Sequence, residues 1–142
     1  MENVKIVCPE CSSVNSIKIV EGVSIACSQC EEYLDDPFPV EVTDASCKVH
    51  ILENDIPILI DFYSTVCGPC MAMYDDYEDA ALEFPLKVRF LKINADEHQK
   101  IAREYGVRAL PTIIAFKKGE EVHRISRQLS RVELNLWAQS LI

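Results

Sequence analysis

Apolar runs and amphipathic stretches alternate along the last hundred residues of the chain. Two runs predict strands buried on both faces, PILIDFY at 57–63 and VRFLKIN at 88–94. Three amphipathic stretches predict helices, at about residues 43–53, 67–84 and 96–105, and Thr43 is the expected N-terminal cap of the first. The alternation of these strands and helices along the chain predicts an α/β domain, with parallel strands sandwiched by helices and an antiparallel edge.

The end of the chain supplies the antiparallel edge and a last helix. The segments TIIAF and VHRIS, joined by KKGEE, predict a hairpin. Ser130 and Glu133 have the spacing of a capping box, which predicts that a helix starts there and runs to about Leu141.

The first 34 residues have a different pattern, with two Cys-x-x-Cys pairs, CPEC and CSQC, fifteen residues apart. Between them, IKIV and VSIA flank Glu21 and Gly22 as the strands of a short hairpin would. Such a ribbon buries too little apolar surface to be stable alone. Because YLDDPFPVEVTD has the composition of a linker, we expect a small domain at residues 1–36 and a larger one at 37–142.

Composition limits the classes of function. The chain has 142 residues, 49% hydrophobic and 26% charged, and a net charge of −9. Residues 1–46 carry two lysines against nine acidic side chains, which would repel a phosphate backbone, so nucleic acid is not an expected partner. No apolar run approaches the ~20 residues that span a membrane, and the start lacks the features of a secretory signal.

These features predict a cytoplasmic monomer with no membrane association. Seven cysteines in a reducing compartment favour metal binding or catalysis over structural disulfides. Four of them have the number and spacing of a tetrahedral zinc site, which predicts one structural zinc ion per chain held by Cys8, Cys11, Cys27 and Cys30.

The third pair, Cys67 and Cys70, follows an apolar strand and opens a helix. Helix N-terminal amides stabilise a thiolate, so this setting favours redox chemistry. A rival interpretation is a second metal site with Cys47 and His50, which have the same spacing. Those two residues fall inside a predicted helix, where cysteine is usually a packing residue and histidine usually faces solvent.

Asp61 interrupts the apolar strand six residues before Cys67. If it is buried there, its pKa is raised and it can exchange a proton with the second thiol. The alternative is an aspartate at a strand end that faces water.

The segments DFYSTVCGPC, VRFLKIN, EYGVRALPT and FKKGE stand in the order and spacing of thioredoxins, which the region from about residue 40 to 142 resembles. With the four cysteines ahead of it, the whole chain resembles the zinc-containing bacterial thioredoxin 2 type. The resemblance implies a thioredoxin fold, a central mixed sheet flanked by helices, preceded by a zinc-ribbon-like domain.

The resemblance also implies a reaction, the reduction of protein disulfides. Cys67 would be the nucleophile, Cys70 the resolving thiol and Asp61 the base for Cys70, while Lys92 would tune Asp61. Disulfide-containing proteins would be the substrates. A thioredoxin reductase would recycle the pair, with NADPH and FAD bound by that partner, since this chain lacks a nucleotide-binding glycine motif.

A substrate groove around the pair follows from the same resemblance. Pro111 would be a cis-proline facing the cysteines, and the groove would comprise Val66, Gly68, Pro69, Leu110, Pro111 and Arg127. Val66 and Tyr63 stand where the family usually has tryptophan. Arg127 replaces a usual glycine, and Met71 and Asp75 replace a basic residue and a proline.

Two alternatives to a reductase stay open at this point. One is a zinc-ribbon adaptor that docks partners through the altered groove with little turnover. The other is a redox switch in which oxidation of the zinc thiolates releases the metal.

Overall fold

A five-stranded mixed sheet forms the centre of the protein, which is described over residues 2–142 by a computed structural model. Its strand order is β3-β5-β4-β6-β7. The bounds are Val40–Glu41 (β3), Ile58–Tyr63 (β4), Arg89–Asn94 (β5), Thr112–Lys117 (β6) and Glu120–Ile125 (β7). β3, β5 and β4 run parallel, whereas β6 and β7 are antiparallel. The predicted parallel strands with an antiparallel edge are therefore confirmed.

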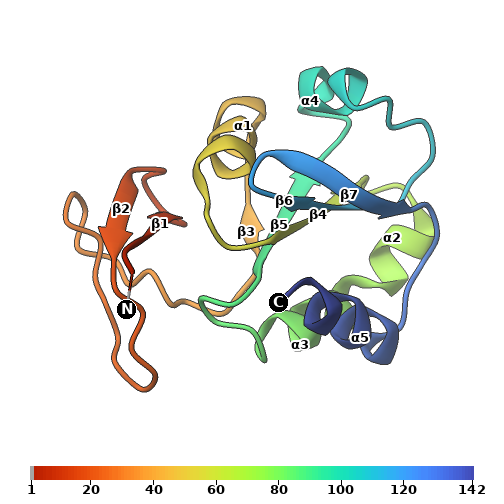
Figure 1. Cartoon of the computed structure of the whole chain (residues 1–142). Coiled ribbons are helices and arrows are strands. Elements are labelled where there is room, and N and C mark those ends of the chain that lie inside the picture. Colours follow the sequence, from red (N-terminus) through yellow and green to blue (C-terminus); the bar gives the residue numbers. More distant parts are fainter. Residues whose placement is uncertain (1) are drawn as a thin grey trace.

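Helices cover both faces of this sheet (Figure 1). One face carries α1 (Asp44–Glu53) and α4 (Gln99–Glu104), and the other carries α3 (Tyr74–Ala81) and α5 (Arg131–Leu141). Each face has its own apolar core. β4 lies between them and is buried at all six positions, which explains why its sequence is almost continuously apolar.

Both predicted N-terminal helix caps are present. The Thr43 hydroxyl accepts a hydrogen bond from the Ser46 amide, and the Ser46 hydroxyl accepts one from the Thr43 amide. Ser130 and Glu133 form the equivalent box at the start of α5. These local interactions explain why the boundaries of α1 and α5 could be predicted.

The prediction of one continuous helix over residues 67–84 is wrong. The segment forms two helices, α2 (Gly68–Ala72) and α3, with Met73 at the junction. Met73 is fully buried, and its sulfur accepts a hydrogen bond from the Leu129 amide. The break lets α3 pack Tyr77 into the core, where the Tyr77 hydroxyl donates to the backbone carbonyls of Leu59 and Leu91.

The predicted N-terminal hairpin is also misplaced. The strands that pair are β1 (Val4–Val7) and β2 (Val14–Ile17), and the first cysteine pair lies in the turn between them. Gly22 does make a turn, with φ of +78°, but the segments on either side of it do not pair as strands in the described chain. Alternating apolar residues on both sides of a turn produced the same pattern that a hairpin does.

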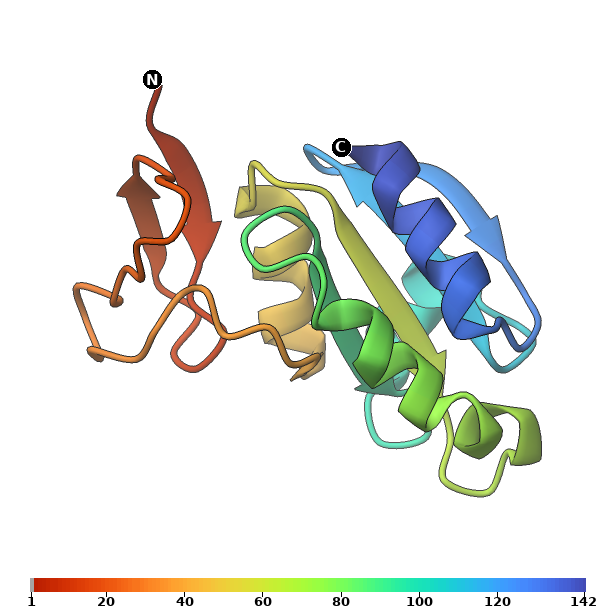
Figure 2. The ribbon, with the colours of Figure 1, turned by 90° about the horizontal axis from the view of Figure 1, so that it is seen from below.

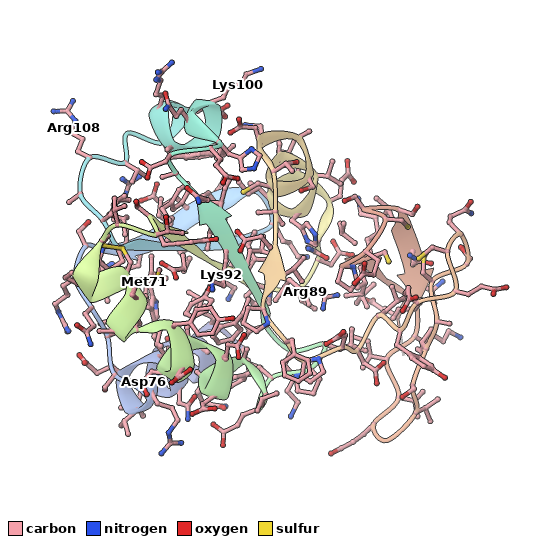
Figure 3. All side chains as sticks on the ribbon, turned by 180° about the vertical axis from the view of Figure 1, so that it is seen from behind. Met71, Asp76, Arg89, Lys92, Lys100 and Arg108 are labelled. Carbon is pink, nitrogen blue, oxygen red and sulfur yellow. A yellow bond between two sulfur atoms is a disulfide. The ribbon has the colours of Figure 1, made fainter. Side chains whose placement is uncertain are left out.

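The N-terminal segment packs against the sheet domain through a shared apolar cluster and a buried polar network. Ile6, Leu34, Ile56 and Leu86 are members of that cluster. Val7, which precedes the first cysteine, donates its amide hydrogen to Asn54 Oδ1, and its carbonyl accepts from Arg89. Figure 3 shows Arg89 on the side of the sheet that faces this segment.

Arg89 is the central residue of this network. It is 3% exposed, and its guanidinium donates to the carbonyls of Val7 (3.3 Å) and Leu34 (3.0 Å). One contact comes before the first cysteine pair and the other after the second. The single side chain therefore ties both halves of the N-terminal segment to β5.

We expect Arg89→Met to lower the free energy of unfolding by about 2–4 kcal/mol, because two buried carbonyls lose a charged donor. Urea unfolding measures the change. Arg108→Met is the matched control, since Arg108 is exposed and has no ion pair among the residues described, and it should change stability by less than about 0.5 kcal/mol. Equal effects of the two substitutions would contradict this role of Arg89.

Candidate functional site

A disulfide joins Cys67 and Cys70 at the start of α2 (Gly68–Ala72). This helix lies at the end of the molecule opposite the N-terminal segment (Figures 1 and 2). Cys67 is the N-cap of α2, and its sulfur accepts a hydrogen bond from the Cys70 amide at 3.3 Å. Cys67 is partly exposed, Gly68 and Pro69 are exposed, and Cys70 is only 2% exposed. One sulfur is therefore accessible to a partner and the other is covered.

The loop from β4 to Cys67 is held by hydrogen bonds of Ser64. Its hydroxyl donates to Asp96 Oδ2 at 2.5 Å and accepts from the Val66 amide at 3.2 Å. Ser64 is 3% exposed, whereas Val66, two residues on, is 89% exposed. The loop is thus anchored at its start and presents Val66 to solvent beside the disulfide.

The turn before β6 lies against the exposed cysteine. The peptide bond between Leu110 and Pro111 is cis, and the Leu110 carbonyl oxygen is 3.6 Å from Cys67 Sγ. Thr112 holds this turn by donating to the Ala109 carbonyl at 2.6 Å. A hollow of about 280 Å³ adjoins Leu110 and includes Asp96 and Arg108 in its walls. The structure therefore brings the first cysteine and the Leu110–Pro111 turn together.

Arg127 forms an ion pair with Glu133 in the first turn of α5. Its guanidinium contacts Glu133 Oε2 at 2.6 Å and the Gln128 carbonyl at 3.1 Å. The Arg127 guanidinium lowers the pKa of Glu133 to about 2. Its charge is therefore already paired at the start of α5.

Asp61 is buried in the middle of β4, which is the first of the two placements that its sequence position allowed. It is 3% exposed, and Oδ1 has no hydrogen-bond partner among the described residues. Burial raises its pKa to about 7, Lys92 opposes that rise, and Glu41 adds to it. The alternative of a strand-end aspartate that faces water is excluded.

Lys92 is the cross-strand neighbour of Asp61 in the parallel pairing of β4 with β5. It is 7% exposed, so its ammonium is nearly enclosed (labelled in Figure 3). Its Nζ lies 3.9 Å from the ring centroid of Tyr74 and 5.0 Å from that of Tyr63. Both are cation–π contacts.

The four N-terminal cysteines form a second cluster. Their sulfur atoms all lie within 4.8 Å of one another. Two of the sulfur pairs, Cys8 with Cys30 and Cys11 with Cys27, are 3.6 Å apart. A tetrahedral ion with bonds of about 2.3 Å to sulfur requires sulfurs about 3.8 Å apart, so the four ligands fit a metal ion.

The two cysteine pairs have the same local geometry. The amides of Glu10 and Gln29 donate to the first sulfur of their pair, both at 3.4 Å. The residues that follow the two pairs, Ser12 and Glu31, both have positive φ, 64° and 71°. Each pair is therefore a turn with an amide directed at a sulfur, an arrangement that stabilises thiolates.

Asn15 supports this cluster from β2. It is 6% exposed, and its side-chain amide donates to Cys27 Sγ at 3.4 Å. Its Oδ1 accepts from the Ser28 amide, which fixes the orientation of the side chain. The hydrogen bond from Asn15 is the largest cause of a lowered pKa at Cys27, about 6.

Cys47 and His50 do not join either site. Among the described residues, the four N-terminal cysteines are the one group of three or more His, Cys, Asp and Glu residues arranged as metal ligands. Cys47 is fully buried in α1, as expected of a packing residue. The expectation that His50 faces solvent is wrong, because it is 1% exposed and its Nδ1 is 2.8 Å from Asn54 Nδ2 within the buried network.

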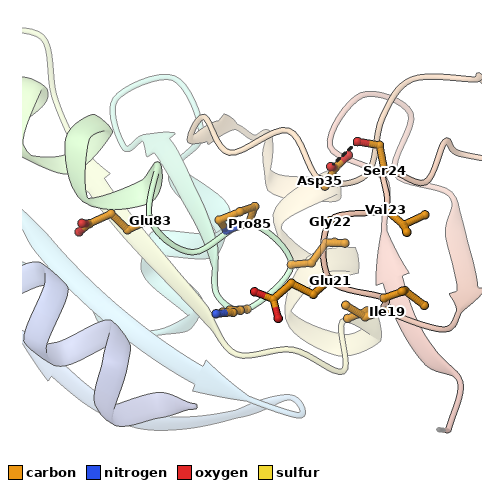
Figure 4. A pocket seen from close by; sticks show the side chains of 11 residues that line it. Ile19, Glu21, Gly22, Val23, Ser24, Asp35, Glu83 and Pro85 are labelled. Carbon is orange, nitrogen blue, oxygen red and sulfur yellow. Dashed lines mark hydrogen bonds between the residues drawn. The ribbon is translucent and has the colours of Figure 1, made fainter.

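A further cleft lies away from the disulfide. It has a volume of about 550 Å³ and lies between the turn at Glu21 and Gly22 and the segment around Pro85 (Figure 4).

No helix of the described residues is long and apolar enough to cross a membrane.

Comparisons with known proteins agree with this geometry. The sequence model of the thioredoxin family matches residues 38–140, and the chain belongs to that family. It is 41% identical over 85 residues to a thioredoxin of Porphyra purpurea, covering 60% of this chain and 79% of that protein. It is 45% identical over 80 residues to a thioredoxin of Rickettsia felis, covering 56% and 76%.

A solved structure supports the same assignment. A mutant thioredoxin from Halobacterium salinarum has a TM-score of 0.68 and 30% identity, over 74% of this chain and 91% of that one. Membership of the family implies thiol-disulfide oxidoreductase activity in general terms.

Sequence reasoning missed several residues that shape the two sites. Arg89, Asn15 and Tyr74 carry no motif, and their contacts come from segments distant in sequence. Arg89 did carry one signal, a charged residue at the start of a strand predicted to be buried.

Asp61 makes stability depend on pH. Its folded pKa of about 7 lies above the ordinary value of 3.8, so between these pH values the folded chain keeps a proton that the unfolded chain has released. Stability therefore falls as pH rises through this window. We expect Asp61→Asn to raise the free energy of unfolding relative to wild type by roughly 2–4 kcal/mol at pH 8 and to give much less gain near pH 4.

Urea unfolding at both pH values measures this difference. Asp79→Asn, an exposed change in α3, is the control and should show no such dependence on pH. A gain for Asp61→Asn that is equal at both pH values would contradict the assignment of a raised pKa.

Proposed function

We propose that the protein reduces disulfides of other proteins through Cys67 and Cys70. The observation that carries the proposal is the asymmetric disulfide, with Cys67 partly exposed against the Leu110 carbonyl and Cys70 covered. Membership of the thioredoxin family supports it. The structure corresponds to the oxidised state of this cycle.

The reaction starts from the reduced pair. The Cys67 thiolate attacks one sulfur of a substrate disulfide, which forms a mixed disulfide and releases the first substrate thiolate. Cys70 then attacks Cys67 Sγ as a thiolate, the mixed disulfide breaks, and the second substrate thiolate leaves. Two electrons have moved to the substrate, and the protein is left with its own disulfide.

Asp61 is proposed as the base that takes the proton from Cys70. A pKa of about 7 suits this role, because such a carboxylate both accepts and returns a proton near neutral pH. Asp61 lies in β4, whose end leads directly into the loop before Cys67. Lys92 is proposed to adjust the pKa of Asp61, since its positive charge lowers this pKa whereas burial raises it.

The proposed substrate groove surrounds the exposed sulfur. Val66, Gly68 and Pro69 are its exposed members on one side of the disulfide, and Leu110 with Pro111 adjoins Cys67 on the other. A backbone carbonyl 3.6 Å from the reacting sulfur can accept a hydrogen bond from an extended substrate peptide. Arg127 is proposed at the rim, although its charge is paired with Glu133.

We further propose that Cys8, Cys11, Cys27 and Cys30 hold one zinc ion, as in the thioredoxin 2 type. Four thiolate ligands that can surround one ion tetrahedrally favour zinc over hard cations. The ion would supply folding free energy to residues 1–36, which have little apolar core of their own. The thioredoxin domain would then span residues 37–142, and the family match from residue 38 supports this boundary.

A thioredoxin reductase with its own flavin and NADPH is the proposed electron donor. The four cysteines of the proposed metal site and the buried Cys47 form no disulfide among the described residues, which fits a reducing compartment such as the cytoplasm.

We expect Cys67→Ser to abolish insulin reduction, with a loss of at least about 100-fold, because the attacking sulfur is gone. The assay follows NADPH oxidation in the presence of a thioredoxin reductase. Cys47→Ala is the matched control and should stay active, since Cys47 lies in α1 away from the disulfide. A fully active Cys67→Ser would exclude the proposed reaction, and a wild type that binds substrate without turnover would favour an adaptor.

Metal analysis of the reduced protein should find one zinc ion per chain. Cys8→Ser and Cys27→Ser should each lose most of it, because a tetrahedral site loses one of four thiolates. Cys47→Ala should retain it. Absence of metal from the reduced wild type, or full retention in both ligand variants, would contradict the zinc proposal.

A further inference from the structure

The ammonium of Lys92 is enclosed by aromatic rings rather than by carboxylates. Its Nζ is 3.9 Å from the centroid of the Tyr74 ring and 5.0 Å from that of Tyr63. Within residues 2–142 it makes no hydrogen bond and no ion pair. The two cation–π contacts are therefore the interactions that hold this charge in place.

The two rings differ in how firmly they are fixed. Tyr63 is 9% exposed, and its hydroxyl donates to Glu41 Oε1 at 2.7 Å, so it forms a rigid wall. Tyr74 is 44% exposed and starts α3, directly after the break at Met73. Because Lys92 beneath it is only 7% exposed, the Tyr74 ring is the cover between the ammonium and solvent.

Asp61 lies on the same side of the sheet as this cover. Side chains alternate along a strand, so Asp61 shares the face of Leu59, which packs against α3 and α5. Lys92 likewise shares the face of Phe90. Tyr74 therefore covers the face on which the aspartate and the lysine are cross-strand neighbours.

We propose that Tyr74 is a positioning residue whose ring holds the Lys92 ammonium beside Asp61 and keeps water away from the pair. The inference rests on the proposed function in one respect, since Asp61 matters for catalysis only if it serves Cys70. Tyr74 acts through its contact with Lys92 and has no direct part in the reaction at the sulfurs.

The groups that face Asp61 decide what removal of the ring does. They are Lys92 from β5, Glu41 from β3, Tyr63 from its own strand and Tyr77 from α3, while the Tyr74 ring of α3 reaches Asp61 through its contact with Lys92. Burial raises the pKa of Asp61 more than Lys92 lowers it. Water that enters in place of the ring weakens both effects, so the pKa moves down toward its ordinary value.

Titration of the Asp61 carboxyl carbon by NMR in the oxidised protein tests the proposal. We expect Tyr74→Ala to lower its pKa by about one unit or more. Tyr74→Phe keeps the ring and should titrate like wild type. Leu82→Ala, which removes an exposed apolar side chain just after α3, is the matched control and should also leave the titration unchanged.

A wild-type titration in Tyr74→Ala would overturn the proposal, as would an equal shift in Tyr74→Phe, because the hydroxyl would then be responsible. If Tyr74→Ala does not fold, Tyr74→Leu replaces it, with a fall in pKa expected and an unchanged pKa again contradictory. The NMR titration uses neither a substrate nor a reductase. If Cys67 and Cys70 prove inactive in the insulin assay, the proposed function is refuted, but the result of the titration is unaffected.

Discussion

Burial of β4 on both faces is the constraint on which the rest of the structure depends. Helices α1 and α4 cover one side and α3 and α5 the other, so every side chain of this strand is removed from water. An aspartate in such a strand must keep its proton or be stabilised by a nearby cation. Asp61 beside Lys92 meets this requirement, and the need to shelter the lysine in turn explains the two tyrosine rings.

The strand β5 connects the two ends of the molecule. Its first residue, Arg89, donates hydrogen bonds to carbonyls on both sides of the cysteine cluster, and three residues further Lys92 is the cross-strand neighbour of Asp61. The N-terminal segment is thus attached by a buried polar network as well as by apolar contacts. It packs as a part of the same body, at the end away from the disulfide (Figure 2).

Local sequence signals predicted a large part of this architecture. The caps at Thr43 and Ser130, the apolar strands and the spacing of the four cysteines each act over a few residues. The misplaced hairpin and the break at Met73 depend on long-range packing, which leaves no local pattern. His50 was assigned to solvent for the same reason, because its partner network exists only when the N-terminal segment is docked. The candidate site divides in the same way. The cysteine pair and the acid ahead of it could be found from the motif and from a charge in an apolar run. The enclosure of Lys92 by Tyr74 could not, because the two residues are eighteen positions apart and meet only when α3 packs on the sheet.

The reduction potential of the couple formed by Cys67 and Cys70 tests the central claim most directly. In the proposed reaction, a charged and poorly hydrated Asp61 would repel the thiolate of Cys70, which would disfavour the reduced form and make the couple an electron donor. Equilibration with a thiol redox buffer should give a value near about −270 mV, the reference value for thioredoxins. A value near about −120 mV would mark an oxidant and would contradict the account.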